Sequence, residues 1–251
     1  MKWPAVALAL LALAGCGDDD PQAADTPQLT VSAAASLKEP FTAYGEQFPE
    51  ARARFSFAGS DELAAQIEQG VKPDVYAAAN TKLPAELHAK GLVEKPAAFA
   101  GNRLVLGVPG ESEVESLEDL AASGVKIAIG ARDVPVGSYT RTVLDKLPKT
   151  QSGAIMDNVA TEEPDVAGIT GKLTQGAVDA GFLYISDVRA TDGKLKAIEL
   201  PADVQPEIAY GAAVVKGAEQ PEIAKQFIDG LLSGAGAQAL EDAGFERPPG
   251  Q

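Results

Sequence analysis

The sequence has little positive charge and no apolar run long enough to cross a membrane. Its 251 residues include 21 Lys or Arg and 36 Asp or Glu, which gives a formal net charge of -15. A nucleic-acid-binding protein needs a basic face to displace counterions from phosphate, so this balance argues against a DNA or RNA partner. The longest apolar run, from Trp3 to Ala14, is too short to span a bilayer as a stable helix.

Histidine and cysteine occur once each, and aromatic residues make up only 6%. A single His excludes a multi-His metal site and most His-based acid/base mechanisms. His88 has no metal-ligand partner at a suitable spacing, so we interpret it as a solvated helix residue. The sequence also lacks the two common glycine-rich phosphate-binding motifs and a G-x-S-x-G nucleophile elbow. We therefore expect no catalytic residue and no cofactor.

The single cysteine ends an N-terminal export signal. Lys2 precedes the apolar run, small residues close it, and LAGC at residues 13–16 resembles the bacterial lipobox, in which the cysteine is diacylated. We expect residues 1–15 to be a lipoprotein signal peptide and Cys16 to be the lipid anchor. Residues 16–28 are polar and predict a flexible tether. A short membrane anchor is the alternative interpretation of residues 1–15.

The body of the chain alternates short apolar runs with helical patterns. With 45% hydrophobic residues it can bury a full core, as one large α/β domain or two lobes of about a hundred residues each. This alternation predicts mainly parallel strands with crossover helices, in two α/β groups. The strand around Tyr210 is a candidate for returning to the first group. We expect strands at 29–34, 54–58, 74–79, 103–108, 125–129, 180–185 and 208–215, and helices at 36–48, 60–70, 82–90, 137–147, 165–176 and 222–232.

Four of these helices start with small or neutral residues. Ligands of parallel α/β sheets bind beyond the carboxyl ends of the strands, where helix N-termini present free N–H groups. Several helix starts that converge on one crevice form an anion site without any Lys or Arg. These starts lie near Ser36, Ser60, 136–137 and 165–166.

A structural interpretation of the same residues competes with this one. Ser36 followed by Glu39 matches a capping box, and Ser60 matches an ordinary N-cap. From spacing alone, capping is favoured for both serines. Tyr184, near the end of an apolar run, is by the same standard more often a core or rim residue than a ligand.

Five segments carry a specific resemblance, in order, from about residue 29 to residue 245. They are LTVSAAASLKEPF, FSFAGSDELAAQIEQGVKPDVYAAAN, DVPVGSYTRTVL, EEPDVAGI and GFLYISDV. Together they resemble the signature segments of bacterial periplasmic molybdate-binding proteins, the solute receptors of molybdate ABC importers. The resemblance implies a two-lobed α/β periplasmic-binding-protein fold of type II, each lobe a mainly parallel sheet flanked by helices, with the ligand in the cleft. It places residues 29–108 plus 208–251 in lobe I and residues 109–207 in lobe II.

The resemblance also implies a ligand set and outweighs the capping interpretation. The oxyanion would be held by two serine hydroxyls, two backbone N–H groups and a tyrosine hydroxyl, and molybdenum would contact the protein only through its oxo groups. The corresponding residues are Ser36, Ser60, Val136, Val166 and Tyr184. Two departures bear on selectivity: Asp61 and Glu62 follow Ser60 where small hydroxyl residues are common, and Val136 stands where Ala is usual.

These observations lead to a functional hypothesis. Molybdate and tungstate carry no proton at neutral pH and suit a site composed only of donors, whereas monohydrogen phosphate needs an acceptor for its own proton. Sulfate is also a bare dianion, but its shorter bonds would leave some donors out of reach. We expect a monomeric receptor, lipid-anchored at the outer face of the cytoplasmic membrane. It would close on the anion by a hinge near Val108 and Ile208 and deliver it to a permease driven by a cytoplasmic ATPase.

Three alternatives remain open at this stage. The first is a receptor of the same fold for sulfate, phosphate or a small organic acid. The second and more remote is a lipid-anchored serine hydrolase using Ser36 or Ser60, for which a base is missing. The third is a purely structural surface lipoprotein, whose stability would not respond to a ligand.

Overall fold

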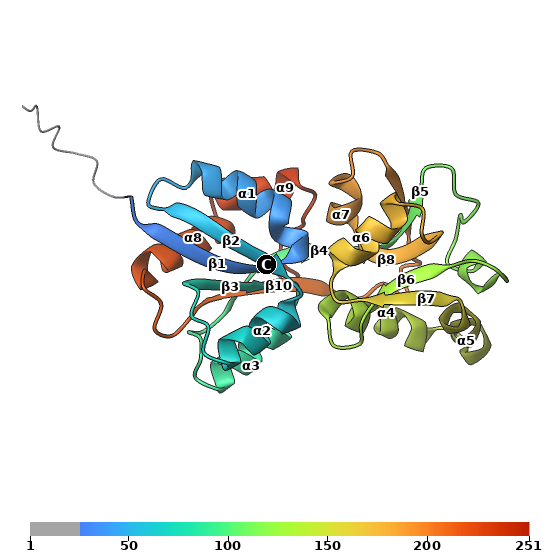
Figure 1. The fold of residues 1–251 in the computed structure, drawn as a ribbon, viewed down its shortest axis with the longest axis horizontal. Coiled ribbons are helices and arrows are strands. Elements are labelled where there is room, and N and C mark those ends of the chain that lie inside the picture. Colours follow the sequence, from blue (N-terminus) through green and yellow to red (C-terminus); the bar gives the residue numbers. More distant parts are fainter. Residues whose placement is uncertain (1–25, 251) are drawn as a thin grey trace, which may run out of the picture.

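The computed structural model describes residues 26–250, which form two lobes side by side (Figure 1). The expected signal peptide, Cys16 and the tether up to residue 25 lie outside the described residues. In residues 26–250 no helix is long and apolar enough to cross a membrane.

The first lobe is built on a five-stranded sheet with strand order β2-β1-β3-β10-β4. β1 pairs in parallel with β2 and β3, whereas β10 pairs antiparallel with β3 and β4. The strand around Tyr210 therefore returns to the first group, as the sequence pattern predicts. The five strands are β1 (Gln28–Ala34), β2 (Arg52–Ala58), β3 (Val75–Ala78), β4 (Ala97–Asn102) and β10 (Ile208–Val214).

The second sheet repeats this plan in the order β7-β6-β8-β5-β9. β6 pairs in parallel with β7 and β8, and β5 pairs antiparallel with β8 and β9. One strand in each sheet thus opposes the other four, so both sheets are mixed but mainly parallel. The strands are β5 (Leu104–Pro109), β6 (Ile127–Gly130), β7 (Val159–Glu163), β8 (Ala180–Tyr184) and β9 (Leu195–Glu199).

The chain crosses between the lobes at two places, and the first differs from the expected boundary after residue 108. β4 ends at Asn102, and β5 begins at Leu104 inside the second sheet. A strand that is apolar throughout carries no sequence signal for which sheet it joins, because both of its faces are buried. We propose a lobe boundary at Arg103, with the return crossing in residues 200–207.

Helices cover both faces of each sheet (Figure 1). In the first lobe α1 (Lys38–Gln47), α8 (Pro221–Leu232) and α9 (Ala235–Asp242) lie on one face, and α2 (Ser60–Glu68) and α3 (Lys82–Ala89) lie on the other. In the second lobe α6 (Val166–Thr174) and α7 (Ile185–Arg189) lie opposite α4 (Pro135–Lys146) and α5 (Lys149–Asp157). Two short 3-10 turns, η1 (Ala35–Leu37) and η2 (Asp119–Ala121), complete the elements.

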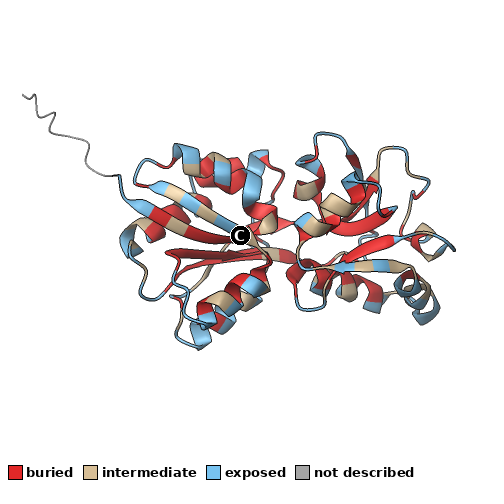
Figure 2. Cartoon of the chain, in the orientation of Figure 1, coloured by how far each residue is buried: buried red, intermediate tan, exposed pale blue. Residues whose placement is uncertain are grey.

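The amphipathic patterns explain how these helices dock. Phe41 and Tyr44 of α1 are buried, and the ring of Phe41 packs edge-on against Phe227 of α8 with ring centroids 5.6 Å apart. Gly70 and Gly91 follow α2 and α3 with φ of 101° and 74°, a region that favours glycine and ends both helices as expected. Figure 2 shows the strands inside each lobe as buried and the outer helix faces as exposed.

Candidate functional site

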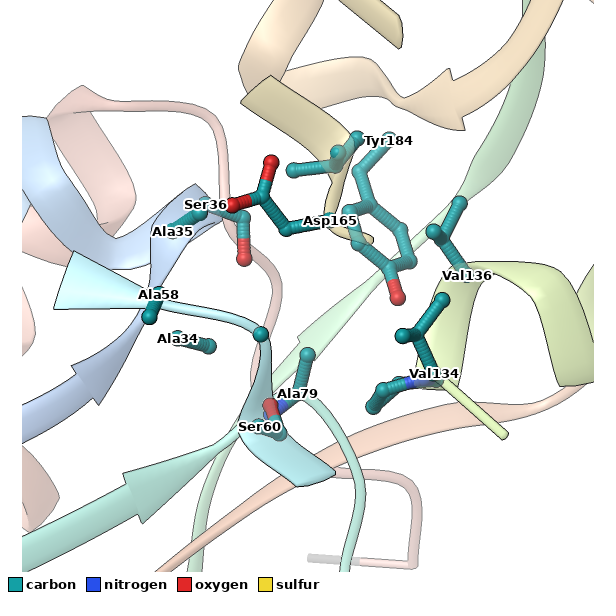
Figure 3. Close-up of a pocket in the computed structure, with 13 residues that line it drawn as sticks. Ala34, Ala35, Ser36, Ala58, Ser60, Ala79, Val134, Val136, Asp165 and Tyr184 are labelled. Carbon is teal, nitrogen blue, oxygen red and sulfur yellow. The ribbon is translucent and has the colours of Figure 1, made fainter. Parts of the chain in front are cut away.

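A small pocket lies between the two lobes, at the carboxyl ends of the strands. All five residues expected to hold an anion line it, and none of its lining residues is Lys or Arg. The first lobe contributes Ala34, Ala35, Ser36, Ala58, Gly59, Ser60 and Ala79, and the second contributes Val134, Pro135, Val136, Asp165, Val166 and Tyr184. In Figure 3 the hydroxyls of Ser36, Ser60 and Tyr184 surround one central space.

Ser36 lies in the 3-10 turn that follows β1. Its hydroxyl lies 3.0 Å from the hydroxyl of Tyr210 and makes no capping hydrogen bond, because α1 begins only at Lys38. The capping-box interpretation of Ser36 and Glu39 is therefore wrong. The extra 3-10 turn turns the buried hydroxyl to the pocket instead of to the backbone of α1 (Figure 3).

Ser60 is the first residue of α2, and Gly59 occupies the N-cap position without a side-chain cap. The N-cap interpretation of Ser60 is also wrong. Its Oγ accepts a hydrogen bond from the backbone N–H of Ala79 at 3.1 Å, and its carbonyl accepts one from Tyr76 Oη at 2.7 Å. Within residues 26–250 the hydroxyl hydrogen of Ser60 has no protein acceptor, so it can point into the pocket.

Val136 and Val166 lie in the first turns of α4 and α6. Pro135 is the first residue of α4 and has no N–H, which makes the N–H of Val136 the first donor of that helix. At α6 the N-cap Asp165 accepts a hydrogen bond from Gly168 N at 2.9 Å, which leaves the N–H of Val166 free of the cap. Both N–H groups therefore lie at the positive ends of helix dipoles.

Tyr184 is the last residue of β8 and is only 1% exposed. Within the described chain its Oη has no hydrogen-bond partner, although it is fully buried. Burial, followed by the neighbouring Tyr210 and Tyr139, raises the pKa of Tyr184 well above its ordinary value, so the hydroxyl stays protonated and can only donate or accept as a neutral group. A buried polar atom without a partner costs about 1 to 3 kcal/mol, which indicates a ligand at this position.

The acidic residues around the pocket are not the ones that the sequence suggested. Neither Asp61 nor Glu62 lines the pocket, and Glu62 accepts a hydrogen bond from Gln66 on the exposed face of α2. Asp165 does line it, and in Figure 3 its carboxylate lies on the Ser36 side. The sequence identified Asp165 only as a helix start, although its position directly before Val166 was a signal for its place in the pocket wall.

A second carboxylate, that of Asp187, lies next to the pocket without lining it. It accepts a hydrogen bond from the backbone N–H of Tyr184 at 3.1 Å. Burial is the main cause that raises the pKa of Asp187 from 3.8 to about 7, and the charge of Asp165 adds to it.

The pocket thus offers several donors and no cationic side chain, with the Asp165 carboxylate as its one acidic group. His88 lies on α3 with its Nδ1 3.1 Å from the carbonyl of Val93, and it does not line the pocket, so it could not serve a serine nucleophile there. No group of three or more His, Cys, Asp or Glu residues in the described part of the chain could hold a metal ion. This chemistry fits a small anion that carries no proton of its own.

Known proteins resemble this chain over nearly its full length. The family described as "Bacterial extracellular solute-binding protein" matches residues 29–246. The molybdate-binding protein ModA of Mycobacterium tuberculosis H37Rv is 32% identical, over 99% of this chain and 100% of that protein.

Solved structures share the fold. The periplasmic molybdate-binding protein of Azotobacter vinelandii superposes with a TM-score of 0.79 at 22% identity, covering 88% of this chain and 99% of that chain. The sulfate-binding protein SubI of Mycobacterium tuberculosis H37Rv reaches the same TM-score at 16% identity, covering 89% and 88%. Since two proteins named for different anions superpose equally well, the fold does not select the anion.

Proposed function

Because the chain belongs to the family of bacterial extracellular solute-binding proteins, we propose that it is an exported receptor for molybdate, and for tungstate, that serves an ABC importer. The family consists of receptors rather than enzymes, in keeping with a pocket that histidine does not line. The proposed ligands of the anion are the hydroxyls of Ser36, Ser60 and Tyr184 and the backbone N–H groups of Val136 and Val166.

The observation that carries this proposal is the buried hydroxyl of Tyr184, which has no partner within residues 26–250 and lines the pocket. Together with the two serines and the two helix starts, it offers donors to a tetrahedral oxyanion from both lobes. A hydrogen bond to a charged acceptor is stronger than one to a neutral acceptor, so a dianion gains from each of these donors.

Protonation and size decide among anions. Monohydrogen phosphate brings a proton that needs an acceptor, whereas the five proposed ligands of the anion are all placed as donors. The one carboxylate of the lining, that of Asp165, caps Gly168 through Oδ1 and leaves only Oδ2 for such a proton. Molybdate and tungstate bring no proton, and they are larger than sulfate, so their oxygens reach donors on both lobes. We therefore place sulfate and phosphate below molybdate in affinity.

The proposed binding cycle uses the two crossings between the lobes. Rotation about Arg103 and residues 200–207 would open the pocket, and closure would bring Val136, Val166 and Tyr184 onto an anion already held by Ser36 and Ser60. Such hinge closure around a ligand needs only a few residues that absorb changes in φ and ψ. The closed complex is the form that would be recognised by a membrane permease with a cytoplasmic ATPase.

We also propose that the protein acts as a monomer tethered through a lipid on Cys16. The LAGC sequence at residues 13–16 and the polar stretch that follows it support this. The tether would hold the receptor at the outer face of the cytoplasmic membrane, within reach of the permease.

Titration of the mature chain, with Cys16 replaced by Ser to prevent acylation, tests the function. A ligand that binds only the folded protein stabilises it by RT ln(1 + [L]/Kd), about 4 kcal/mol at a thousandfold excess over Kd. Molybdate and tungstate should raise the melting temperature clearly, and calorimetry should give a tight Kd for both. Equal shifts from sulfate or phosphate at the same concentration would contradict the argument from size and protonation.

A further inference from the structure

We propose that Tyr210 and Asn102 are specificity-determining positioning residues, which orient the Ser36 hydroxyl so that its hydrogen points to the bound anion. The inference rests on the proposed function. Neither residue lines the pocket, and both reach it through the hydrogen bond between Tyr210 and Ser36. A buried series of hydrogen bonds runs from Asn102 through Tyr210 to Ser36.

The amide of Asn102, the last residue of β4, has a defined orientation. Its Oδ1 accepts a hydrogen bond from the backbone N–H of Arg103 at 2.8 Å, which identifies that atom as the oxygen. The other atom is therefore Nδ2, a donor only. Nδ2 lies 2.9 Å from Ser186 Oγ and 3.4 Å from Tyr210 Oη, so it donates one hydrogen to each.

This orientation determines the direction of the next hydrogen bond. Tyr210 is completely buried, and its Oη accepts from Asn102. Because Nδ2 of Asn102 can only donate, we infer that the hydrogen of Tyr210 goes to Ser36 Oγ, which lies 3.0 Å away. Burial raises the pKa of Tyr210 well above its ordinary value, so the hydrogen is present at any physiological pH.

Ser36 is consequently left with one free hydrogen and an oxygen that already accepts. Ser60 reaches the same state by another route, because its Oγ accepts from the backbone N–H of Ala79. Both serines thus face the pocket as donors. Ser36 is oriented by the side chains of Tyr210 and Asn102, and Ser60 by the backbone N–H of Ala79. A hydroxyl oxygen has two acceptor positions, so each serine keeps only one of them for an anion that carries its own O–H, and such an anion is disfavoured.

The same series of hydrogen bonds connects the pocket to the crossing between the lobes. Asn102 directly precedes Arg103 at the β4–β5 crossing, and its second hydrogen bond goes to Ser186 on α7 of the second lobe. Tyr210 lies on β10, just after the return crossing. The orientation of Ser36 is thus set where both crossings meet, and Asn102 contacts both lobes.

A double-mutant cycle tests the inference. The parent, Tyr210→Phe, Ser36→Ala and the double variant are titrated with molybdate and with phosphate by calorimetry. We expect Tyr210→Phe to weaken molybdate binding by about three- to tenfold, the loss of one neutral hydrogen bond. In the Ser36→Ala background the same change should have almost no effect, because Tyr210 acts through Ser36.

The selectivity for molybdate over phosphate is a second measurement, and it would not change if Tyr210 had only a structural role. Without the hydrogen from Tyr210, both acceptor positions of Ser36 Oγ are free and the hydroxyl can rotate to accept from a protonated anion. Phosphate should therefore lose less affinity than molybdate in Tyr210→Phe, so the Kd for phosphate divided by the Kd for molybdate should fall. Tyr44→Phe is the matched control: Tyr44 is also buried and donates to the carbonyl of Phe227, but it lies within the first lobe away from the pocket. Its affinity and selectivity should equal those of the parent.

The outcomes separate the two proposals. Additive losses, or parental affinity in Tyr210→Phe, overturn the positioning role. If Tyr210→Phe does not fold, Asn102→Asp replaces it, because an acceptor in place of Nδ2 would reverse the direction of the hydrogen bonds that lead to Ser36. Asn102→Asp should then weaken molybdate binding by a larger factor when Ser36 is present than in the Ser36→Ala background. A parent that binds sulfate instead of molybdate overturns the proposed ligand, and the cycle run with sulfate still decides the role of Tyr210. A parent that binds no oxyanion overturns both.

Discussion

Gly59 of the first lobe approaches Pro164 of the second so closely that a Cβ on Gly59 would lie 2.7 Å from the carbonyl oxygen of Pro164. Real Cβ atoms do not come this close to a backbone oxygen, so one of the two chains would have to move. Both residues border the pocket, since Gly59 lines it and Pro164 precedes Asp165. The absence of a side chain at Gly59 is thus a condition for the lobes to approach each other across the anion.

Gly59→Ala should therefore weaken molybdate binding by more than about tenfold while leaving the ligand-free protein stable. The φ of -58° and ψ of 136° at Gly59 are ordinary for alanine, so the new methyl group causes no backbone strain. Its contact with Pro164 arises only when the lobes are together. Calorimetric titration gives the affinity, and thermal unfolding without ligand gives the stability.

The control for this variant is Gly153→Ala in α5, where a Cβ would have no neighbour within 4 Å. It should bind molybdate as the parent does. A Gly59→Ala protein with parental affinity would show that closure does not bring Gly59 and Pro164 together. A loss of stability without ligand would instead show that the two lobes are in contact in the empty protein.

Tyr184→Phe should reduce the affinity for molybdate by about ten- to a hundredfold, since a hydrogen bond to a charged group is worth about 1.5 to 3 kcal/mol. Binding should survive, because the N–H groups of Val136 and Val166 are backbone donors that this change does not remove. The ligand-free protein should unfold at the same temperature or slightly higher, since Oη has no partner to lose in the described chain. Unchanged affinity would identify Tyr184 as a packing residue.

Asp187→Asn should alter how stability depends on pH. The folded protein holds a proton on Asp187 up to about pH 7, whereas the unfolded chain loses it near 3.8. The folded state thus binds more protons between these values, so this group lowers stability as the pH rises from about 4 to 7 and has a constant effect above that. The amide can still accept from Tyr184 N but does not titrate, so the decline in melting temperature between pH 5 and 8 should become smaller by a few degrees.

Asp203→Asn is the control for that measurement, because it removes the same charge from an exposed position. The melting temperature of this variant should fall with pH as that of the parent does. An Asp187→Asn protein with the parental pH profile would show that the carboxyl is ionised throughout this range.

Cys16→Ser should abolish acyl-chain labelling in cells and leave uncleaved precursor or free protein. Cys16 lies outside the described residues, so this prediction depends only on the LAGC sequence and the apolar run before it. Labelling with a fatty-acid analogue and membrane fractionation measure it. A variant that is still acylated and still fractionates with membranes would rule out Cys16 as the anchor.

Strong local patterns located most of the inner strands and the longer helices. The buried stripe of α8 carries apolar residues at helical spacing, and β8 is a continuous apolar run of strand length. Sequence reasoning did not place the edge strands β4, β7 and β9 or the helices α5, α7 and α9. β7 and β9 are half exposed, and β4 and α9 are rich in alanine and glycine. A short edge strand or a small-residue helix buries little, so its pattern differs little from that of a loop.

The amino-acid sequence by itself determined the chemistry available at the pocket: neutral helix starts, small residues after the strands, and hydroxyls rather than Lys, Arg or His. These are local properties, because a helix start presents free N–H groups wherever the helix is placed. Only the tertiary structure decided which sheet β5 joins, that Gly59 meets Pro164, and that Tyr210 reaches Ser36 across 174 residues of sequence. Such contacts depend on how the sheets are paired and how the lobes meet, which apolar strands with two buried faces leave open in the sequence.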